Sequence, residues 1–321
     1  MAIIEVFPGH PKAIRNAVAL AKPGDVILVH RGVYHESVRI PSEKSNIRLV
    51  AERRHQAILD GNHVLTAAFE LNRVAGVEIE GIKIRNYISR GINIVNGKSN
   101  RMIQNRISGI GGANDPVGIF DTNSVGNLMM MNTIERIGSA GTGTGILLDG
   151  TTGNWVIQNT LQHNEAHGIE VKNGRHGAIV GNRISRNKGD AILMNALDNN
   201  LIMDNHLYYN GANGVNGRST NNIILNCKIR GNRKNGLLFA SNYNFAGFNQ
   251  IMDHHGSGID VSSDFNDIQE NRIEQNGKNG VLIHSPHMAN FVYRNRLSNN
   301  QPHNIQDSGV NNNIVQNDSE E

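Results

Sequence analysis

Charged side chains that could carry acid–base chemistry gather in the middle of the sequence. Lys172 is a candidate base, because partial burial beside like charges makes a lysine release its proton more readily, although Glu170 and Asp149 would oppose this. Arg218 is a candidate clamp for a substrate carboxylate, because a guanidinium pairs with a carboxylate through two parallel hydrogen bonds. These residue types suit proton transfer on an anionic substrate. The alternative is that Glu170, Lys172 and Asp149 form ordinary surface ion pairs.

Histidines and carboxylates also cluster elsewhere. The segment "DHHGSGIDVSSD" (253–264) is followed by "HSPH" (284–287) and by His303, and imidazole and carboxylate groups are suitable metal ligands. Their spacing matches no metal cage that we can name, so the metal ligands stay unknown. The segment "QHNEAHGIE" (162–170) holds two more histidines near Glu170, which are either catalytic or turn residues.

A repeat must position these residues. One marker is an asparagine between apolar positions, and a second is a small residue before an apolar pair. Both recur every 21 to 27 residues. The asparagines are Asn105, Asn132, Asn159, Asn182, Asn205, Asn226, Asn249, Asn271 and Asn295. The small residues are Gly91, Gly118, Gly145, Gly168, Ala191, Gly214, Gly236, Gly258 and Gly280. Two markers with one period indicate a repeat protein.

Each repeat contains short runs that alternate apolar and polar residues, separated by turns rich in Asn, Gly, Asp and Ser. This pattern predicts strands, and no repeat has room for a helix of ten residues. The period is too short for a propeller blade, and the consensus of leucine-rich repeats is missing. The sequence therefore predicts an all-β solenoid of parallel strands, one coil per repeat.

A solenoid explains the recurring asparagine. Equivalent residues of successive coils stack at about 4.8 Å, so inward amides can bond to one another in a ladder that offsets their desolvation. We predict a second ladder five residues further on, at Asn164, Asn187, Asn210, Asn276 and Asn300. The single cysteine, Cys227, is predicted to be a small core residue.

Function must then lie on an outer face. Counting from each marker glycine, residues two and four positions later should point outward. The first outward column is Asn93, Phe120, Leu147, Glu170, Leu193, Asn216, Leu238, Asp260 and Leu282. The second outward column is Val95, Thr122, Asp149, Lys172, Asn195, Arg218, Ala240, Ser262 and His284. From these columns we predict catalytic roles for Lys172, Arg218 and Glu170, and substrate binding by Phe120, Asp149, Asn195, Asn216, Asp260 and His284.

Composition narrows the function classes. The net charge of the 321 residues is only +3, and basic residues do not cluster with aromatic ones, so we expect no nucleic-acid partner. No apolar run is long enough to span a bilayer, and the N-terminus lacks the order of a signal peptide. We expect a soluble chain without membrane insertion, of unknown compartment.

The N-terminal segments "AIRNAVALAKPGDVILVHRGVYHESVRI" (13–40) and "AILDGNH" (57–63) resemble the right-handed parallel β-helix superfamily, which includes pectin lyase-like and NosD-like proteins. The resemblance implies a right-handed coil, and we expect about eleven coils in a single domain, 1–321. An N-terminal strand and capping helix would fill 1–35, the coils 36–310, and a polar tail or oligomer contact 311–321.

The resemblance also implies a carbohydrate-active protein that acts on an acidic polysaccharide or oligosaccharide by uronate β-elimination or epimerisation. A base would remove the proton beside the carboxylate, and Arg218 or Ca²⁺ held by outward carboxylates would stabilise the resulting anion. Ca²⁺ is the one cofactor expected. The sequence departs from known enzymes, since "NDPVGIFD" (114–121) keeps only two residues of an epimerase "DPHE" motif and the loops are short.

Two alternatives therefore stay open beside a polysaccharide lyase or epimerase. The first is a non-catalytic glycan-binding or structural module, such as a phage tail or surface component, which could be a homo-oligomer. The second is a NosD-like accessory role in metal handling, prompted by the histidines between 253 and 303.

Overall fold

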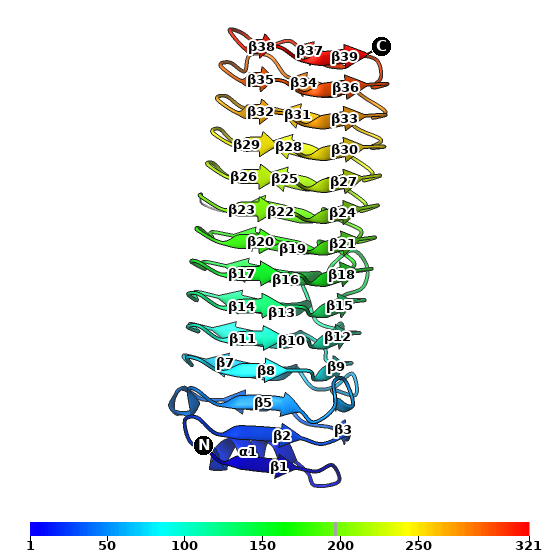
Figure 1. Ribbon diagram of the computed structural model, residues 1–321. Coiled ribbons are helices and arrows are strands. Elements are labelled where there is room, and N and C mark those ends of the chain that lie inside the picture. Colours follow the sequence, from blue (N-terminus) through cyan, green and yellow to red (C-terminus); the bar gives the residue numbers. More distant parts are fainter. Residues whose placement is uncertain (196–197, 321) are drawn as a thin grey trace. The chain divides into compact units, whose positions relative to one another are not determined.

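The computed structural model describes residues 1–195 and 198–320. The chain divides into two units, residues 1–166 and 167–321. Each unit is a parallel β-solenoid in which the chain passes through sheets C, A and B in turn and adds one strand to each (Figure 1). The all-β solenoid predicted from the repeat is confirmed.

The first unit contains the following strands. Sheet A holds β1 (Ile3–Val6), β2 (Val26–Val29), β5 (Arg48–Ala51), β8 (Glu78–Glu80), β11 (Arg101–Ile103), β14 (Leu128–Met130) and β17 (Trp155–Ile157). Sheet B holds β3 (Gly32–Tyr34), β6 (Ala57–Asp60), β9 (Lys83–Arg85), β12 (Arg106–Ser108), β15 (Thr133–Glu135) and β18 (Thr160–Gln162). Sheet C holds β4 (Val38–Ile40), β7 (Ala67–Asn72), β10 (Arg90–Val95), β13 (Val117–Thr122) and β16 (Thr144–Asp149).

The second unit repeats the pattern with shorter strands. Sheet A holds β20 (Ala178–Val180), β23 (Leu201–Met203), β26 (Ile223–Leu225), β29 (Phe245–Gly247), β32 (Asp267–Gln269), β35 (Phe291–Tyr293) and β38 (Asn313–Val315). Sheet B holds β21 (Arg183–Ser185), β24 (His206–Tyr208), β27 (Lys228–Arg230), β30 (Gln250–Met252), β33 (Arg272–Glu274), β36 (Arg296–Ser298) and β39 (Asp318–Glu320). Sheet C holds β19 (Ile169–Lys172), β22 (Ile192–Asn195), β25 (Val215–Gly217), β28 (Leu237–Phe239), β31 (Ile259–Val261), β34 (Val281–Ile283) and β37 (Ile305–Asp307).

The number of coils is larger than expected. The two units together make about fourteen turns, not eleven. Residues 1–35, assigned to one strand and a capping helix, contribute three strands, and residues 311–320, expected to be a polar tail or an oligomer contact, contribute two more. Polar sequence did not prevent strand formation there, because β38 pairs in register with β35, and this pairing satisfies the backbone N–H and C=O groups that face β35.

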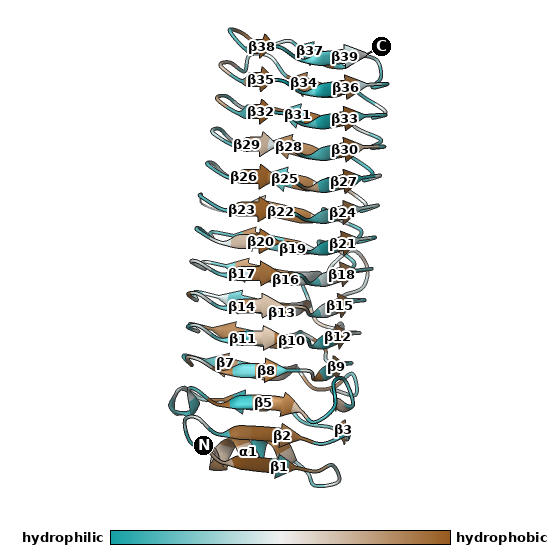
Figure 2. Ribbon diagram, in the orientation of Figure 1, coloured by the Kyte–Doolittle hydropathy of each residue, from teal (hydrophilic) through white to brown (hydrophobic). Residues whose placement is uncertain are grey.

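Register is uniform within each unit, so equivalent side chains stack. In the first unit Asn93 pairs with Phe120, and Phe120 with Leu147. The interior is lined by buried isoleucine, leucine and valine, and strands such as β23 and β26 are strongly hydrophobic (Figure 2). The marker glycines are required by packing, since a Cβ at Gly118 would lie 2.5 Å from the Ile134 side chain.

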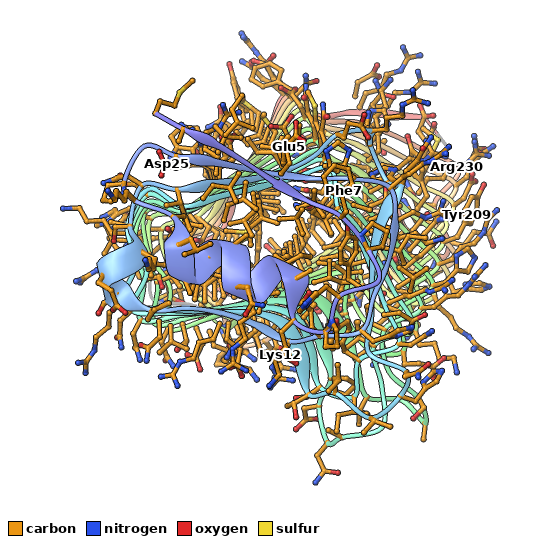
Figure 3. All side chains as sticks on the ribbon, turned by 90° about the horizontal axis from the view of Figure 1, so that it is seen from below. Glu5, Phe7, Lys12, Asp25, Tyr209 and Arg230 are labelled. Atoms are coloured by element: carbon orange, nitrogen blue, oxygen red, sulfur yellow. The ribbon has the colours of Figure 1, made fainter. Side chains whose placement is uncertain are left out.

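Helix α1 (Ala13–Leu20) lies across the N-terminal end of the first unit (Figure 3). Its apolar face buries Ile14, Ala17 and Val18, as the predicted capping helix requires. The Glu36 carboxylate accepts the backbone N–H groups of Ile14 and Arg15 at 3.0 Å, and Lys44 donates to the last carbonyls of the helix. Both charges complement the helix dipole. This lysine lies in a 3₁₀ turn, η1 (Ser42–Lys44). Among the described residues, no helix is long and apolar enough to cross a membrane.

The predicted asparagine ladders are present. At a step between two asparagines, the amide oxygen of one coil accepts the backbone N–H and the side-chain N–H of the coil before, as Asn271 does for Asn249 at 2.9 Å for both bonds. The same amide nitrogen also donates to a core carbonyl, so a buried polar side chain keeps its hydrogen bonds. A third ladder, missed from the sequence, precedes sheet A. In the second unit it includes Asn200, Asn222, Asn244, Asn266, Asn290 and Asn312.

One predicted ladder member was wrong. Asn226 has a left-handed backbone (φ 50°), is exposed, and donates to Asp204 at the surface. Cys227 takes the ladder place instead, because the coil from Asn205 has 22 residues rather than 21. The backbone N–H of Cys227 donates to Asn249 Oδ1 at 2.8 Å, but its thiol offers the Asn205 amide only a weak acceptor at 4.0 Å.

Replacing Cys227 with asparagine is expected to complete this ladder. The new amide oxygen would accept from Asn205, as asparagines do at the neighbouring steps, and we expect the free energy of unfolding to rise by about 1 kcal/mol. Chemical denaturation of the variant and the wild type measures this. Cys227→Ala, which fills less space and accepts nothing, should instead lower stability, and a more stable alanine variant would contradict the interpretation.

A histidine occupies one place of the second ladder. His254 is buried, its Nδ1 accepts the Asn232 N–H at 3.0 Å, and its Nε2 lies 3.2 Å from the Ile229 carbonyl. Both contacts fit only the neutral ring, and burial lowers the pKa of His254 to about 4. Because this pKa lies below that of the unfolded chain, the folded state excludes a proton and loses stability as pH falls from about 6.5 toward 4.

Replacing His254 with asparagine should remove this acid sensitivity. We expect the variant to be more stable than the wild type by about 2 kcal/mol at about pH 5 and nearly unchanged at about pH 8. Thermal or urea unfolding across that range tests it. His255→Asn, at the exposed neighbouring residue, serves as control and should follow the wild-type curve. An equal shift at both pH values would contradict the titration argument.

Candidate functional site

Sheet C of the second unit presents the outward columns predicted from the sequence. Glu170 pairs with Leu193, and the register continues through Asn216, Leu238, Asp260 and Leu282. Seven of the nine predicted site residues lie on this face. Phe120 and Asp149 lie on sheet C of the first unit, where the guanidinium of Arg90 covers the Phe120 ring at 5.0 Å.

The predicted base, Lys172, is engaged by a carboxylate. Its Nζ lies 3.2 Å from Glu170 Oε1, and the Glu170 side chain is only 10% exposed. Through this contact Glu170 holds the Lys172 side chain, the cation of this part of the face, at the surface. Asn195 lies beside it, because Asn195 pairs with Lys172 in register.

A buried carboxylate organises the next part of the face. Asp190 Oδ1 accepts both the backbone and side-chain N–H of Asn213 at 2.8 Å, and its Oδ2 accepts from Asn216 at 3.1 Å. Asn216 Oδ1 in turn accepts from Arg218 Nε at 3.3 Å, so the exposed guanidinium is held at a fixed place. His167 adjoins this cluster, since its Nδ1 lies 3.1 Å from the Asp190 backbone nitrogen.

Asp260 and His284 form a pair of the kind that orients a general base. His284 Nε2 lies 2.9 Å from Asp260 Oδ1, and this carboxylate also accepts from Asn235 at 3.2 Å and from the Ser262 hydroxyl at 3.4 Å. An ionised carboxylate can only accept, so Nε2 carries a proton, and Nδ1 is the ring nitrogen left to accept one when the ring is neutral. The Asp260 side chain is 16% exposed and that of His284 45%. The arrangement therefore holds an accessible imidazole in a fixed orientation at the outer face.

A second histidine pair lies in the turn that follows. His287 Nδ1 is 3.2 Å from Asp264 Oδ1, and the same oxygen accepts the Met288 N–H at 2.9 Å. Two aromatic rings, Tyr243 and Phe265, stack in the corresponding turns of the preceding coils, with centroids 5.2 Å apart and planes 10° apart. Both rings are about half exposed and could support a sugar ring.

The sequence pattern missed Asp190, Asn213 and Asn235 as members of the face. All three immediately precede a marker residue, and that position could have served as a third outward column. The histidine clusters do not form a metal centre. His254 is in the core, while His284 and His287 pair with separate carboxylates, and no group of three ligands that could hold a metal occurs among residues 1–195 and 198–320.

Stacked parallel coils with a polar outer face define a right-handed parallel β-helix protein. Residues 139–242 and 179–319, together more than half of the chain, match the sequence profile of the right-handed β-helix region. The chain belongs to this family. No curated protein matches the sequence.

Solved structures share the fold at low sequence identity. The A-module of mannuronan C-5 epimerase AlgE6 from Azotobacter vinelandii is 14% identical, with a TM-score of 0.76, over 97% of this chain and 94% of that one. A mutant of the periplasmic alginate epimerase AlgG is 15% identical, with a TM-score of 0.67, over 99% and 84%. The Dettilon tailspike protein is 16% identical, with a TM-score of 0.72, over 88% and 62%. At these identities the likeness shows a common fold.

Proposed function

We propose that the protein binds an acidic polysaccharide along sheet C of the second unit and removes the proton beside a uronate carboxylate. The observation that carries this proposal is the Asp260–His284 pair on the outer face. His284 Nδ1 takes the proton, and Asp260 holds the ring and stabilises the imidazolium that forms. Two of the solved structures with this fold are named as uronan epimerases, which supports the substrate class.

The cations of the face serve mainly to bind the polymer. Arg218 follows β25 and His284 follows β34, three coils apart, which is about 14 Å at the spacing of stacked strands. One sugar unit cannot reach both, so Arg218 and Lys172 hold carboxylates of neighbouring units. The anion that develops beside His284 needs its own stabilisation, which His287 in its charged form, or a Ca²⁺ ion recruited with the substrate, would supply.

The reaction can be tested by hydrogen exchange into the sugar. Polymannuronate, polygalacturonate and hyaluronan would be incubated with the protein in deuterated water, with and without Ca²⁺, and followed by proton NMR and ultraviolet absorbance. Loss of the H-5 signal with the chain intact indicates epimerisation. Loss of the H-5 signal together with the ultraviolet absorbance of a new double bond indicates elimination. No change in any polymer would contradict proton abstraction on those substrates.

A non-catalytic glycan-binding module is the second candidate. The observation that favours it is that Lys172 and Arg218 are both held by protein groups away from the His284 base. The likeness to a tailspike protein agrees with this reading. Stable homotrimers that bind polymer without exchange would support it, whereas monomers that exchange H-5 would contradict it. Light scattering combined with the NMR assay separates the two.

A further inference from the structure

A groove of about 430 Å³ lies on a different face, over sheet B of the second unit. It crosses β21, β24, β27 and β30, and Figure 3 shows Tyr209 and Arg230 beside it at the outer surface. Its lining includes Arg183, Tyr208, Tyr209, Lys228, Arg230 and Gln250.

One tyrosine of the groove offers an open aromatic surface. The Tyr209 ring packs against the backbone of Gly231, where a Cβ would come within 2.5 Å of the ring, and 54% of the residue is exposed. The neighbouring Tyr208 ring is covered by the Arg183 guanidinium at 5.7 Å. Glycine at position 231 thus leaves room for the Tyr209 ring, and the exposed part of this ring, which lines the groove, offers a platform for one ring of a ligand.

The groove is positively charged. Arg183 and Lys228 occupy equivalent places two coils apart, with His206 between them in register. Arg230 is neutralised by Asp253 at 2.6 Å, but no carboxylate is among the described residues that line the groove. Burial, together with Lys228 and Arg183, lowers the pKa of His206, which agrees with a local excess of positive charge.

We propose that this groove is a second binding site, specific for an anionic oligosaccharide. Tyr209 stacks on one sugar ring, Arg183 and Lys228 bind acidic groups on neighbouring sugars, and Gln250 donates to a hydroxyl. Single-stranded nucleic acid fits less well, because binding of consecutive bases needs successive open aromatic platforms and Tyr209 is the single one here among the lining residues described. The site has no catalytic group in the position of a base and does not depend on the proposed reaction.

Calorimetry with short ligands tests this site. The full chain would carry Lys172→Ala and Arg218→Ala, so that the cations of sheet C do not contribute, and would be titrated with a mannuronate hexasaccharide, a heparin hexasaccharide and neutral cellohexaose. We expect the two anionic ligands to bind, more weakly at raised salt, and cellohexaose to bind at least tenfold more weakly. The comparison between the two anionic ligands shows whether carboxylate or sulfate is preferred.

Three variants in that background make the test specific. Tyr209→Ala and Lys228→Ala should each weaken binding by about tenfold, and Lys228→Arg should restore it. Arg272→Ala is the matched control, because Arg272 continues the same column but is paired with Glu274 outside the groove, and it should bind as the parent does. Each variant's melting curve shows whether it folds.

Unchanged affinity in both Tyr209→Ala and Lys228→Ala would overturn the proposal. Tighter binding of an oligothymidylate, lost in the same variants, would overturn its assignment to sugars. Failure of the proposed function is distinguishable from either result. A protein that exchanges no H-5 but binds hexasaccharide through Tyr209 and Lys228 contradicts the reaction alone. A protein that exchanges H-5 but binds hexasaccharide equally well with both residues replaced contradicts the groove alone.

Discussion

Replacing His284 with alanine is expected to reduce the rate of H-5 exchange by about 10² to 10⁴-fold, the range that a positioned general base contributes. The side chain is 45% exposed and packs in no core, so the variant should fold as the wild type does. Substrate binding should change little, because the carboxylate partners Arg218 and Lys172 are retained. Exchange rates measured at saturating and at low polymer concentration separate the two effects.

Added imidazole sharpens this test. The truncated side chain leaves space beside Asp260, and free imidazole that binds there should restore part of the exchange rate. His255→Ala removes an exposed histidine from the turn between β30 and β31 and should leave exchange unchanged. If His284→Ala exchanges H-5 at the wild-type rate, the Asp260–His284 pair is a structural contact and the proposed base is wrong.

Replacing Asp121 with asparagine is expected to stabilise the first unit by about 3 kcal/mol above pH 7. Asp121 lies on β13 and its side chain is buried in the interior of the solenoid, between the core residues Ile94 and Leu148 of the adjacent coils. Its Oδ2 accepts from Asn127 at 2.9 Å and Asn154 at 2.7 Å, but Oδ1 accepts no hydrogen bond from the residues that the structure describes. Burial is the main cause that raises the pKa of Asp121 to about 6.

The sign of the pH dependence follows from that shift. The folded-state pKa of Asp121 lies above the unfolded value of about 3.8, so the folded state holds a proton more tightly and stability falls as pH rises from about 4 to 6. Asn keeps an acceptor for Asn127 and Asn154 and removes the charge. The gain should therefore vanish below about pH 4 and level off above about pH 7.

Urea denaturation at several pH values measures the effect. Asp115→Asn, at an exposed carboxylate of the same unit, is the matched control and should change stability little at any pH. Asp121→Leu should destabilise the unit, because it leaves two buried amide donors without an acceptor. A stabilisation by asparagine that persists unchanged at pH 4 would contradict the role assigned to the buried charge.

The candidate site was only partly predictable. Alternation along each strand was enough to place Asp260 and His284 on the outer face, since inward and outward positions follow from the pleat. Their contact was not predictable, because it joins residues of two coils through particular rotamers. The contact of Lys172 with Glu170 also depends on particular rotamers, and the sequence suggested Lys172 as a candidate base.

The groove over sheet B shows the limit more clearly. Arg183, Tyr209 and Lys228 lie in three different coils, and no motif links them along the chain. Even the ladders, which the repeat predicts well, required the structure to decide between Asn226 and Cys227. A shift of one residue in a coil reverses which side chain faces inward, and only backbone pairing fixes that count.

The sequence by itself determined the repeat, the parallel coils, the buried asparagine ladders and the capping helix. These features follow from local alternation and from one residue recurring once per coil, which any reader of the chain can count. The tertiary structure alone decided which outward side chains meet. Asp260 reaches His284, Asp190 holds Asn216, and Tyr209 lies on Gly231, because coil length and backbone register bring residues some 20 to 26 positions apart to within contact distance.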